Sequence, residues 1–218
     1  MLSQRCIDLT RRAGSLVLCA LLVAGCASLP GASGDRQERN AEVGRDGKVM
    51  REIPAKARTL FEQAVATMAA GDYVDAELRF QEFLLQYPDF PGAHVNLAII
   101  HAINGDDQAA ENSITDALII DPEHPEALNQ LGMLLRRQGK FPEAESAYLK
   151  AVTANPDYAL AHYNLGVLYE LYLQRLDAAL QQYERYQALS GEDKQVAKWI
   201  ADLKRRLGTS QRTANVTE

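Results

Sequence analysis

The chain has 218 residues, of which 47% are hydrophobic and 24% charged, and its formal net charge is −6. This composition is typical of a globular protein and excludes a fibrous or wholly disordered chain. The acidic balance argues against nucleic-acid binding, because a binding surface for phosphates needs a stripe of Lys and Arg. All three cysteines, Cys6, Cys19 and Cys26, lie near the start of the chain. The remainder therefore offers no disulfide, no catalytic thiolate and no cysteine zinc site.

The chain opens with a basic segment followed by an apolar one. Residues 1–12 carry three arginines and one acid, and the strongly apolar run is short, covering only positions 16–24. A helix that spans a bilayer needs ~20 apolar residues. The short run is instead typical of the hydrophobic region of a secretory signal peptide.

The end of this segment carries a first resemblance. The tetrapeptide VAGC at 23–26 is similar to the lipobox of bacterial lipoproteins, in which the cysteine is diacylated and the chain is cut before it. The resemblance implies that residues 1–25 are a removed signal peptide and that Cys26 is the lipid-attachment residue, since two acyl chains suffice for stable anchoring. Because Ala27 follows, the enterobacterial sorting pattern implies the periplasmic face of the outer membrane.

Two other interpretations of the N-terminus stay open. Residues 13–34 carry no charge, so an uncleaved anchor fits, as does an ordinary signal peptide cut near Ala27. In each case residues 26–53 are rich in Gly, Ser and charged side chains, which predicts a flexible tether. Such a tether reaches ~25–30 Å typically and ~90 Å at most.

From Pro54 onward the sequence repeats, and equivalent positions differ by 34 in number, as in 88 − 54 = 34. Apolar residues at i, i+3, i+4 and i+7 predict two amphipathic helices per period, separated by glycine and proline. One such unit cannot bury its own apolar stripes, so neighbouring units must stack. Four columns share the period: Pro54, Pro88, Pro122 and Pro156; Gly71, Gly105 and Gly139; Leu97, Leu131 and Leu165; Ala76, Ala110, Ala144 and Ala178.

This unit resembles the tetratricopeptide repeat family, and the third copy, "PEALNQLGMLLRRQGKFPEAESAYLKAVTANP" at 125–156, resembles it most. The resemblance implies an all-α fold, a right-handed superhelical array of about four helix-turn-helix repeats within 54–193. The repeats are expected at 57–90, 91–124, 125–158 and 159–193.

The end of the array departs from the pattern. In the fourth copy Leu173 replaces the turn glycine and the apolar stripe resumes one position late, at Leu176, which predicts a one-residue insertion in the turn. Residues 194–208 predict a capping helix that ends at Gly208, because a terminal repeat otherwise exposes an apolar face. Residues 209–218 predict a disordered tail.

No catalytic constellation stands out in the repeats. Among the four histidines, His94 and His162 share a repeat column with Leu60 and Leu128, which favours packing over metal binding. The glycines fall at helix ends and form no phosphate-binding loop. The sequence therefore predicts no enzyme, no metal, no cofactor and no small-molecule substrate.

The tetratricopeptide resemblance implies a binding surface instead, because the first helix of each repeat in that family lines a concave groove for a peptide, helix or loop. The apolar members of the groove are also explained in part by packing between repeats. Tyr172, in the enlarged turn, is a further candidate contact. The groove carried over by aligned columns comprises Phe61, Val65, Met68, Val95, Asn96, Ile99, Asn129, Gln130, Met133, Arg136, Tyr163, Asn164, Val167 and Glu170.

The carboxylate clamp of the family's chaperone-tail binders is not formed in this sequence. Phe61, Val65 and Glu126 replace its Lys, Asn and Lys, and Gln130 replaces its Arg; Asn96 alone matches. A different protein partner is therefore expected.

Together these features predict a lipid-anchored scaffold that assists an envelope machine. Resemblance implies three neighbourhoods: pilotin-like lipoproteins that guide pilus or secretion secretins, adaptors for cell-wall hydrolases, and accessories of envelope transport. The first is slightly favoured. A self-assembling structural lipoprotein is the alternative from another class.

Overall fold

The structure is a computed structural model that describes residues 42–43, 49–50 and 53–216. The predicted signal peptide, Cys26 and most of the predicted tether lie outside the described residues. Their assignments therefore stay predictions.

The chain divides into two compact units, Met1–Met50 and Arg51–Glu218. In the first unit the two-residue strands β1 (Glu42–Val43) and β2 (Val49–Met50) pair antiparallel. The second unit holds all the described helices, and the remainder of this section concerns that unit.

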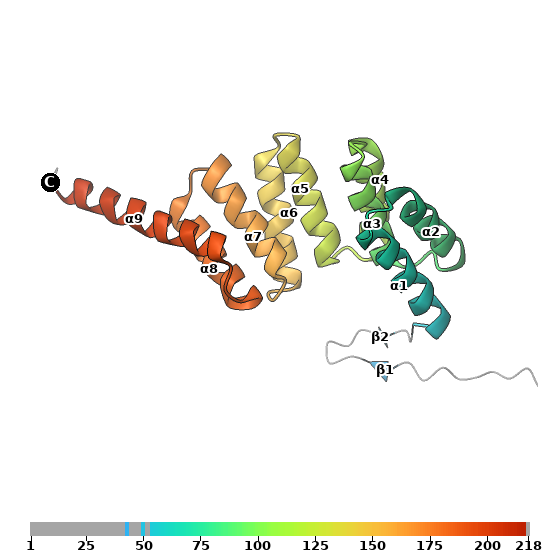
Figure 1. The fold of residues 1–218 in the computed structure, drawn as a ribbon. Helices are drawn as coiled ribbons and strands as arrows, with labels where there is room; N and C mark the ends of the chain where they lie inside the picture. The colour runs from blue at the N-terminus through green and yellow to red at the C-terminus, as the bar shows by residue number, and fades with distance from the viewer. Residues whose placement is uncertain (1–41, 44–48, 51–52, 217–218) are drawn as a thin grey trace, which may run out of the picture. The chain divides into compact units, whose positions relative to one another are not determined.

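The helices of the second unit follow one another as hairpins, α1 with α2, α3 with α4, α5 with α6 and α7 with α8 (Figure 1). The predicted all-α array of four helix-turn-helix repeats with a capping helix is confirmed. The elements are α1 (Ala55–Ala69), α2 (Tyr73–Gln86), α3 (Pro91–Ile103), α4 (Asp107–Ile120), α5 (Pro125–Arg137), α6 (Phe141–Ala154), α7 (Ala159–Val167), the π-helix η1 (Leu168–Tyr172), α8 (Leu176–Ser190) and α9 (Lys194–Val216).

The turn inside each of the first three repeats has one geometry. In the second repeat Gly105 adopts a φ of +78°, a value that costs glycine little. The carboxylate of Asp106 then caps the next helix by accepting a hydrogen bond from the Ala109 N–H at 2.9 Å. Gly71 and Gly139 also have a positive φ. The backbone conformation of the turn therefore recurs with the same period as the sequence.

The fourth repeat accommodates the predicted inserted residue as η1. The N–H of Leu173 donates to the carbonyl of Leu168 at 3.1 Å, a bond that reaches back five positions in place of four. The positive φ then falls on Gln174, at +55°. Its distance from the turn glycine Gly139 is 174 − 139 = 35, one more than the period of 34. The insertion is thus absorbed before the turn, and the turn itself keeps its left-handed residue.

The capping helix α9 is longer than the sequence predicts. It passes through Gly208 and continues to Val216, which corrects both the predicted end at Gly208 and the predicted disordered tail as far as Val216. A glycine inside a helix costs only ~1 kcal/mol and does not by itself end one. Gly208 lacks the positive φ of the turn glycines, and the Thr209 hydroxyl donates to the Arg205 carbonyl at 2.9 Å, within the helix.

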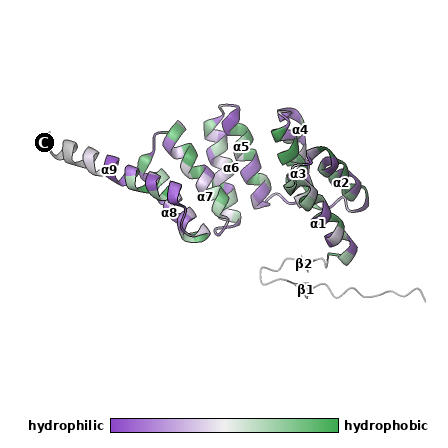
Figure 2. Cartoon of the chain, in the orientation of Figure 1, coloured by the Kyte–Doolittle hydropathy of each residue, from purple (hydrophilic) through white to green (hydrophobic). Residues whose placement is uncertain are grey.

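Hydrophobic and hydrophilic residues alternate along the helices (Figure 2). Aromatic side chains pack together in the core of the first and last repeats. Offset and edge-to-face ring packing of this kind stabilises a core beyond its buried area. In the described part of the chain, none of the helices combines the length and apolar character needed to cross a bilayer. The first cluster holds Phe61, Phe80, Phe83 and Phe90, and the last holds Tyr163, Tyr183, Tyr186 and Trp199.

Candidate partner-binding groove

A cavity of about 520 Å³ lies between the first helices of the repeats. Its lining comes from α1, α3 and α5 and from the start of α7, four segments that the repeat places in equivalent positions. Five residues predicted for the groove line it: Phe61, Val95, Asn96, Ile99 and Gln130.

A second cavity, of about 310 Å³, shares the lining residue Gln130 with the first. Its deepest part is aliphatic because the buried Ala98, Ala110, Ile114 and Leu134 contribute to it. Four predicted residues also line it, namely Gln130, Met133, Arg136 and Tyr172, together with Arg137. We call the two cavities together the groove, and the second one the Arg136 cavity.

The amides predicted to contact a partner differ in what they can offer. Asn129 and Asn164 are buried, and the Asn164 Nδ2 donates to the Asn129 Oδ1 at 3.0 Å. Asn96 donates to the Gly92 carbonyl of its own helix at 2.8 Å. Gln130 makes no side-chain hydrogen bond to any described residue. Its amide is therefore the one of the four that can pair with a partner's backbone.

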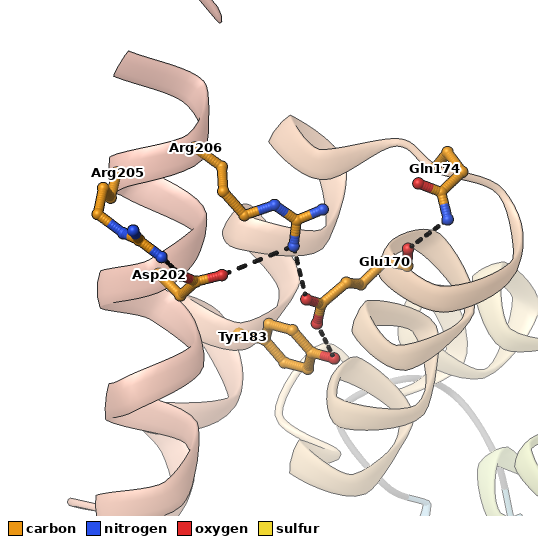
Figure 3. A network of polar contacts seen from close by, with 6 residues as sticks. All are labelled: Glu170, Gln174, Tyr183, Asp202, Arg205 and Arg206. Atoms are coloured by element: carbon orange, nitrogen blue, oxygen red, sulfur yellow. Dashed lines mark hydrogen bonds and ion pairs between the residues drawn. The ribbon is translucent and has the colours of Figure 1, made fainter. Parts of the chain in front are cut away.

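The fourth repeat contributes less than the sequence predicts. Tyr163 and Val167 pack into the core beneath the capping helix. Glu170 accepts hydrogen bonds from the Tyr183 hydroxyl at 3.1 Å and from the Arg206 guanidinium at 3.2 Å (Figure 3). These side chains are engaged by the chain's own cap, which corrects their assignment to an open surface.

The first repeat also contributes less. Val65 and Met68 line neither cavity, although Val65 is partly exposed. Met68 packs against the phenylalanine core. Phe61 alone represents α1 in the groove.

Charge is distributed unevenly along α5. The Arg136 guanidinium lies 5.9 Å from the centre of the Tyr172 ring, and no carboxylate among the described residues lies within ion-pair distance of it. Arg137, beside it, pairs with Asp107. Near the other end of α5 the Glu126 carboxylate lies 3.3 Å from the His124 imidazole.

Buried phenols accompany the groove and show no sign of acid–base chemistry. Burial raises the pKa of Tyr148 and of Tyr158 to about 12, so both stay neutral at physiological pH. The Tyr148 hydroxyl has no hydrogen-bond partner among the described residues. Within the same residues, no cluster of three or more His, Cys, Asp or Glu side chains could hold a metal ion.

Sequence reasoning missed part of the lining of the first cavity. Gly92, Glu126 and Leu160 all line it and occupy one repeat column. They lie one helical turn before the predicted groove positions of their helices. The repeat period could therefore have identified them as groove residues. The buried aliphatic residues of the Arg136 cavity could not be identified in this way, because in the sequence they resemble any other residue of the hydrophobic core.

The chain belongs to the tetratricopeptide repeat family. The family model described as Tetratricopeptide repeat matches residues 61–125 and 129–194, more than half of the chain. Among curated proteins, none matches the chain's sequence. The fold and the family together define a helical repeat scaffold.

Solved structures share this fold at low sequence identity. One is pilF of Pseudomonas aeruginosa, 24% identical over 72% of each chain, with a TM-score of 0.62. Another is a thermophilic TPR protein of Thermus thermophilus, 21% identical over 69% of this chain and 82% of its own, with a TM-score of 0.59. A third, the first TPR of Spaghetti (RPAP3) bound to an HSP90 peptide, is 23% identical over 54% of this chain and 95% of its own, with a TM-score of 0.50.

Proposed function

We propose that this protein is a scaffold that holds a segment of another protein in the groove along α1, α3 and α5. The observation that carries the proposal is that the groove contains an exposed apolar side chain and polar groups that are not paired within the described part of the protein. Met133 is 36% exposed, and the Gln130 amide and the Arg136 guanidinium stand beside it without polar partners among the described residues. The RPAP3 structure, which holds a peptide on the same fold, supports this use of the architecture.

The proposal includes a membrane location. Lipid on Cys26 would fix the protein to the periplasmic face of the outer membrane, and residues 26–53 would let the helical unit stand away from it. The support is the VAGC motif and the short hydrophobic segment before it. Cells labelled with radioactive palmitate should label the wild type and not Cys26→Ser; label at the N-terminus of the variant would contradict the anchor.

The partner is proposed to belong to an envelope machine, with a secretin of a pilus or secretion system favoured. The support is the pilotin-like combination of lipoprotein signal and tetratricopeptide repeats, and a fold shared with pilF of Pseudomonas aeruginosa over 72% of each chain. An adaptor for cell-wall hydrolases or for envelope transport uses the same groove and the same anchor.

Crosslinked capture from membranes tests the groove. Met133→Asp removes an apolar contact and adds a carboxylate that the partner must desolvate, so we expect at least tenfold less partner recovered. Leu149→Asp is the matched control, since Leu149 is 42% exposed on α6 and lines neither groove cavity. Equal loss with both variants, or with neither, would contradict the groove as the binding surface.

Self-association is the second candidate, and α2 carries the observation that favours it. Val74, Leu78 and Leu85 share one face of α2 and are 74%, 55% and 86% exposed. An apolar stripe of this kind marks interaction surfaces. Light scattering of residues 51–218 decides between the two: a monomer favours the scaffold, whereas a tight dimer dispersed by Leu78→Asp favours self-assembly.

A further inference from the structure

Arg136 differs from the other arginines in its part of the fold. The arginines nearest to it in the fold pair with carboxylates: Arg137 with Asp107, Arg175 with Glu145 at 2.6 Å. Arg136 instead lies over the Tyr172 ring, and that ring packs on Phe141 with the ring centres 4.8 Å apart. A guanidinium over a ring face is held by cation–π attraction and keeps its hydrogen-bond donors free.

The residue equivalent to Arg136 in the fourth repeat is a carboxylate that is already paired. Glu170 stands one full period after Arg136, in the same repeat column. Its Oε1 pairs with Arg206 of α9 at 3.2 Å and its Oε2 accepts from Tyr183 at 3.1 Å (Figure 3). Tyr183 and the capping helix thus engage the carboxylate of Glu170, whereas Arg136 has no ion-pair partner among the described residues.

The described neighbours of Arg136 include buried phenols that stay neutral at physiological pH. Tyr148 is one of these neighbours, because the positive charge of Arg136 acts to lower the pKa of Tyr148. Tyr172 also lies close enough to Tyr148 to influence that pKa. The buried Tyr148 hydroxyl has no described hydrogen-bond partner. Arg136 thus has no ion pair with a described carboxylate, although the whole chain is acidic, with a net charge of −6.

Beside this cation lies the apolar part of the Arg136 cavity. Its volume of about 310 Å³ is bounded by aliphatic side chains such as Ile114 and Leu134, and Met133 and Tyr172 stand exposed at 36% and 44%. The cavity is therefore complementary to a segment in which an apolar residue stands next to an acidic one.

We propose that the Arg136 cavity recognises an acidic-apolar segment of the partner, with a Leu-, Met- or Phe-sized side chain against Met133 and Tyr172 and an adjacent carboxylate on the Arg136 guanidinium. This inference rests on the proposed function and names the partner's chemistry. Its column, which holds Met68, Ala102, Arg136 and Glu170, is none of those in which the chaperone-tail clamp is expected. The site is thus formed by side chains of the second, third and fourth repeats of this chain.

Peptide selection tests the recognition without knowledge of the partner. A phage library of random dodecapeptides is selected on immobilised residues 51–218, the compact helical unit, as wild type and as Arg136→Glu. The wild type should enrich Asp or Glu next to Leu, Met or Phe, whereas Arg136→Glu should lose that preference and enrich Lys or Arg. The same residue preference from both proteins, or no enriched peptide from the wild type, would overturn the inference.

A synthetic copy of the best dodecapeptide, labelled with a fluorophore, gives the affinity. Replacing its Glu by Gln should weaken binding to the wild type about tenfold, the range of a charge-assisted hydrogen bond, and should change nothing for Arg136→Gln. Arg79→Gln is the matched control, because it removes one arginine charge from the exposed surface of α2 and should leave the Glu preference intact. A Glu preference that survives Arg136→Gln would contradict the assignment.

The two proposals fail separately. If Met133→Asp abolishes capture of the membrane partner while the selected peptides show no acidic preference, the groove stands and the recognition by Arg136 falls. If the peptides follow the charge of position 136 but membrane capture ignores Met133→Asp, the cavity binds acidic segments without serving the proposed partner.

Discussion

The ring of Tyr148 occupies the space that a side chain at position 132 would need. A Cβ built on Gly132 would lie 2.5 Å from the Tyr148 Cε1, closer than real Cβ contacts allow. The next repeat has the same relationship between Gly166 and Tyr183, at 2.7 Å. Two helices of one repeat approach closely because one of them has no side chain at the crossing.

This contact predicts that Gly132→Ala destabilises the fold, although alanine favours helices. The clash should cost ~1–3 kcal/mol, partly offset by the ~1 kcal/mol that alanine gains over glycine in a helix. Urea unfolding should therefore show a net loss of about 1 kcal/mol. A variant as stable as the wild type would contradict the contact.

The second repeat supplies the matched control. Ala98 and Ile114 occupy the columns of Gly132 and Tyr148, and both are buried. The double variant Gly132→Ala with Tyr148→Ile copies that pair, so it should recover part of the stability lost by Gly132→Ala alone. Strictly additive effects would show that the two residues do not share one contact.

The buried Asn129–Asn164 hydrogen bond should join the third and fourth repeats. Asn129→Ala leaves the Asn164 Nδ2 without its acceptor, and an unsatisfied buried donor costs ~1–3 kcal/mol. The double alanine variant should lose less than the sum of the two single variants. A double-mutant cycle in urea measures the difference, and a coupling of zero would contradict a shared bond.

The fold could be predicted from the sequence because its rules act locally and recur. Gly105 and its equivalents need a left-handed backbone, the small residues at Ala98 and Gly132 permit close helix crossings, and the period aligns them. The inserted residue was visible in the sequence because the apolar stripe of the fourth repeat resumes one position late. The sequence did not predict that the insertion forms a π-helix or that Gln174 takes the left-handed position, because both depend on which backbone hydrogen bonds form.

The site was predictable only in part, since it depends on what the capping helix covers. Glu170 looks equivalent to Arg136 in the sequence, yet Glu170 pairs with Arg206, whereas Arg136 lies over the Tyr172 ring. The partner of Glu170 belongs to α9, which is not part of a repeat, so the repeat period could not predict this contact. The burial of Asn129 likewise follows from a partner, Asn164, one repeat away.

Gln174 is expected to hold an unfavourable backbone. Its φ of +55° is one that non-glycine residues rarely adopt. Gln174→Gly should stabilise the protein by ~1 kcal/mol, and the reciprocal Gly139→Gln should destabilise it by a similar amount. Thermal or urea unfolding of the pair checks this; a loss of stability with Gln174→Gly would mean that the Gln174 Nε2 bond to the Glu170 carbonyl matters more.

Asp193 should make the capping helix sensitive to acid. Its carboxylate accepts hydrogen bonds from the backbone N–H groups of Val196 and Gln195, which lower the pKa of Asp193 below its usual value. A depressed folded-state pKa gives stability that is present above the unfolded pKa of ~3.9 and is lost as the pH falls through the folded value.

The matched variant is Asp193→Asn, because asparagine also caps helices but does not titrate. We expect it to keep the helix and to reduce the loss of stability below about pH 4. Urea unfolding of both proteins between neutral and acid pH tests this. Identical acid dependence would show that Asp193 contributes nothing to it.

The central claim is that a partner segment lies in the groove, and photo-crosslinking tests it most directly. A photoreactive side chain at position 130, between the two cavities, is compared with one at position 149 on α6, in cells with the wild-type N-terminus. The account predicts one defined crosslinked polypeptide from position 130, reduced by Arg136→Glu, and none from position 149. Crosslinks from position 149 alone, or none from position 130, would contradict it.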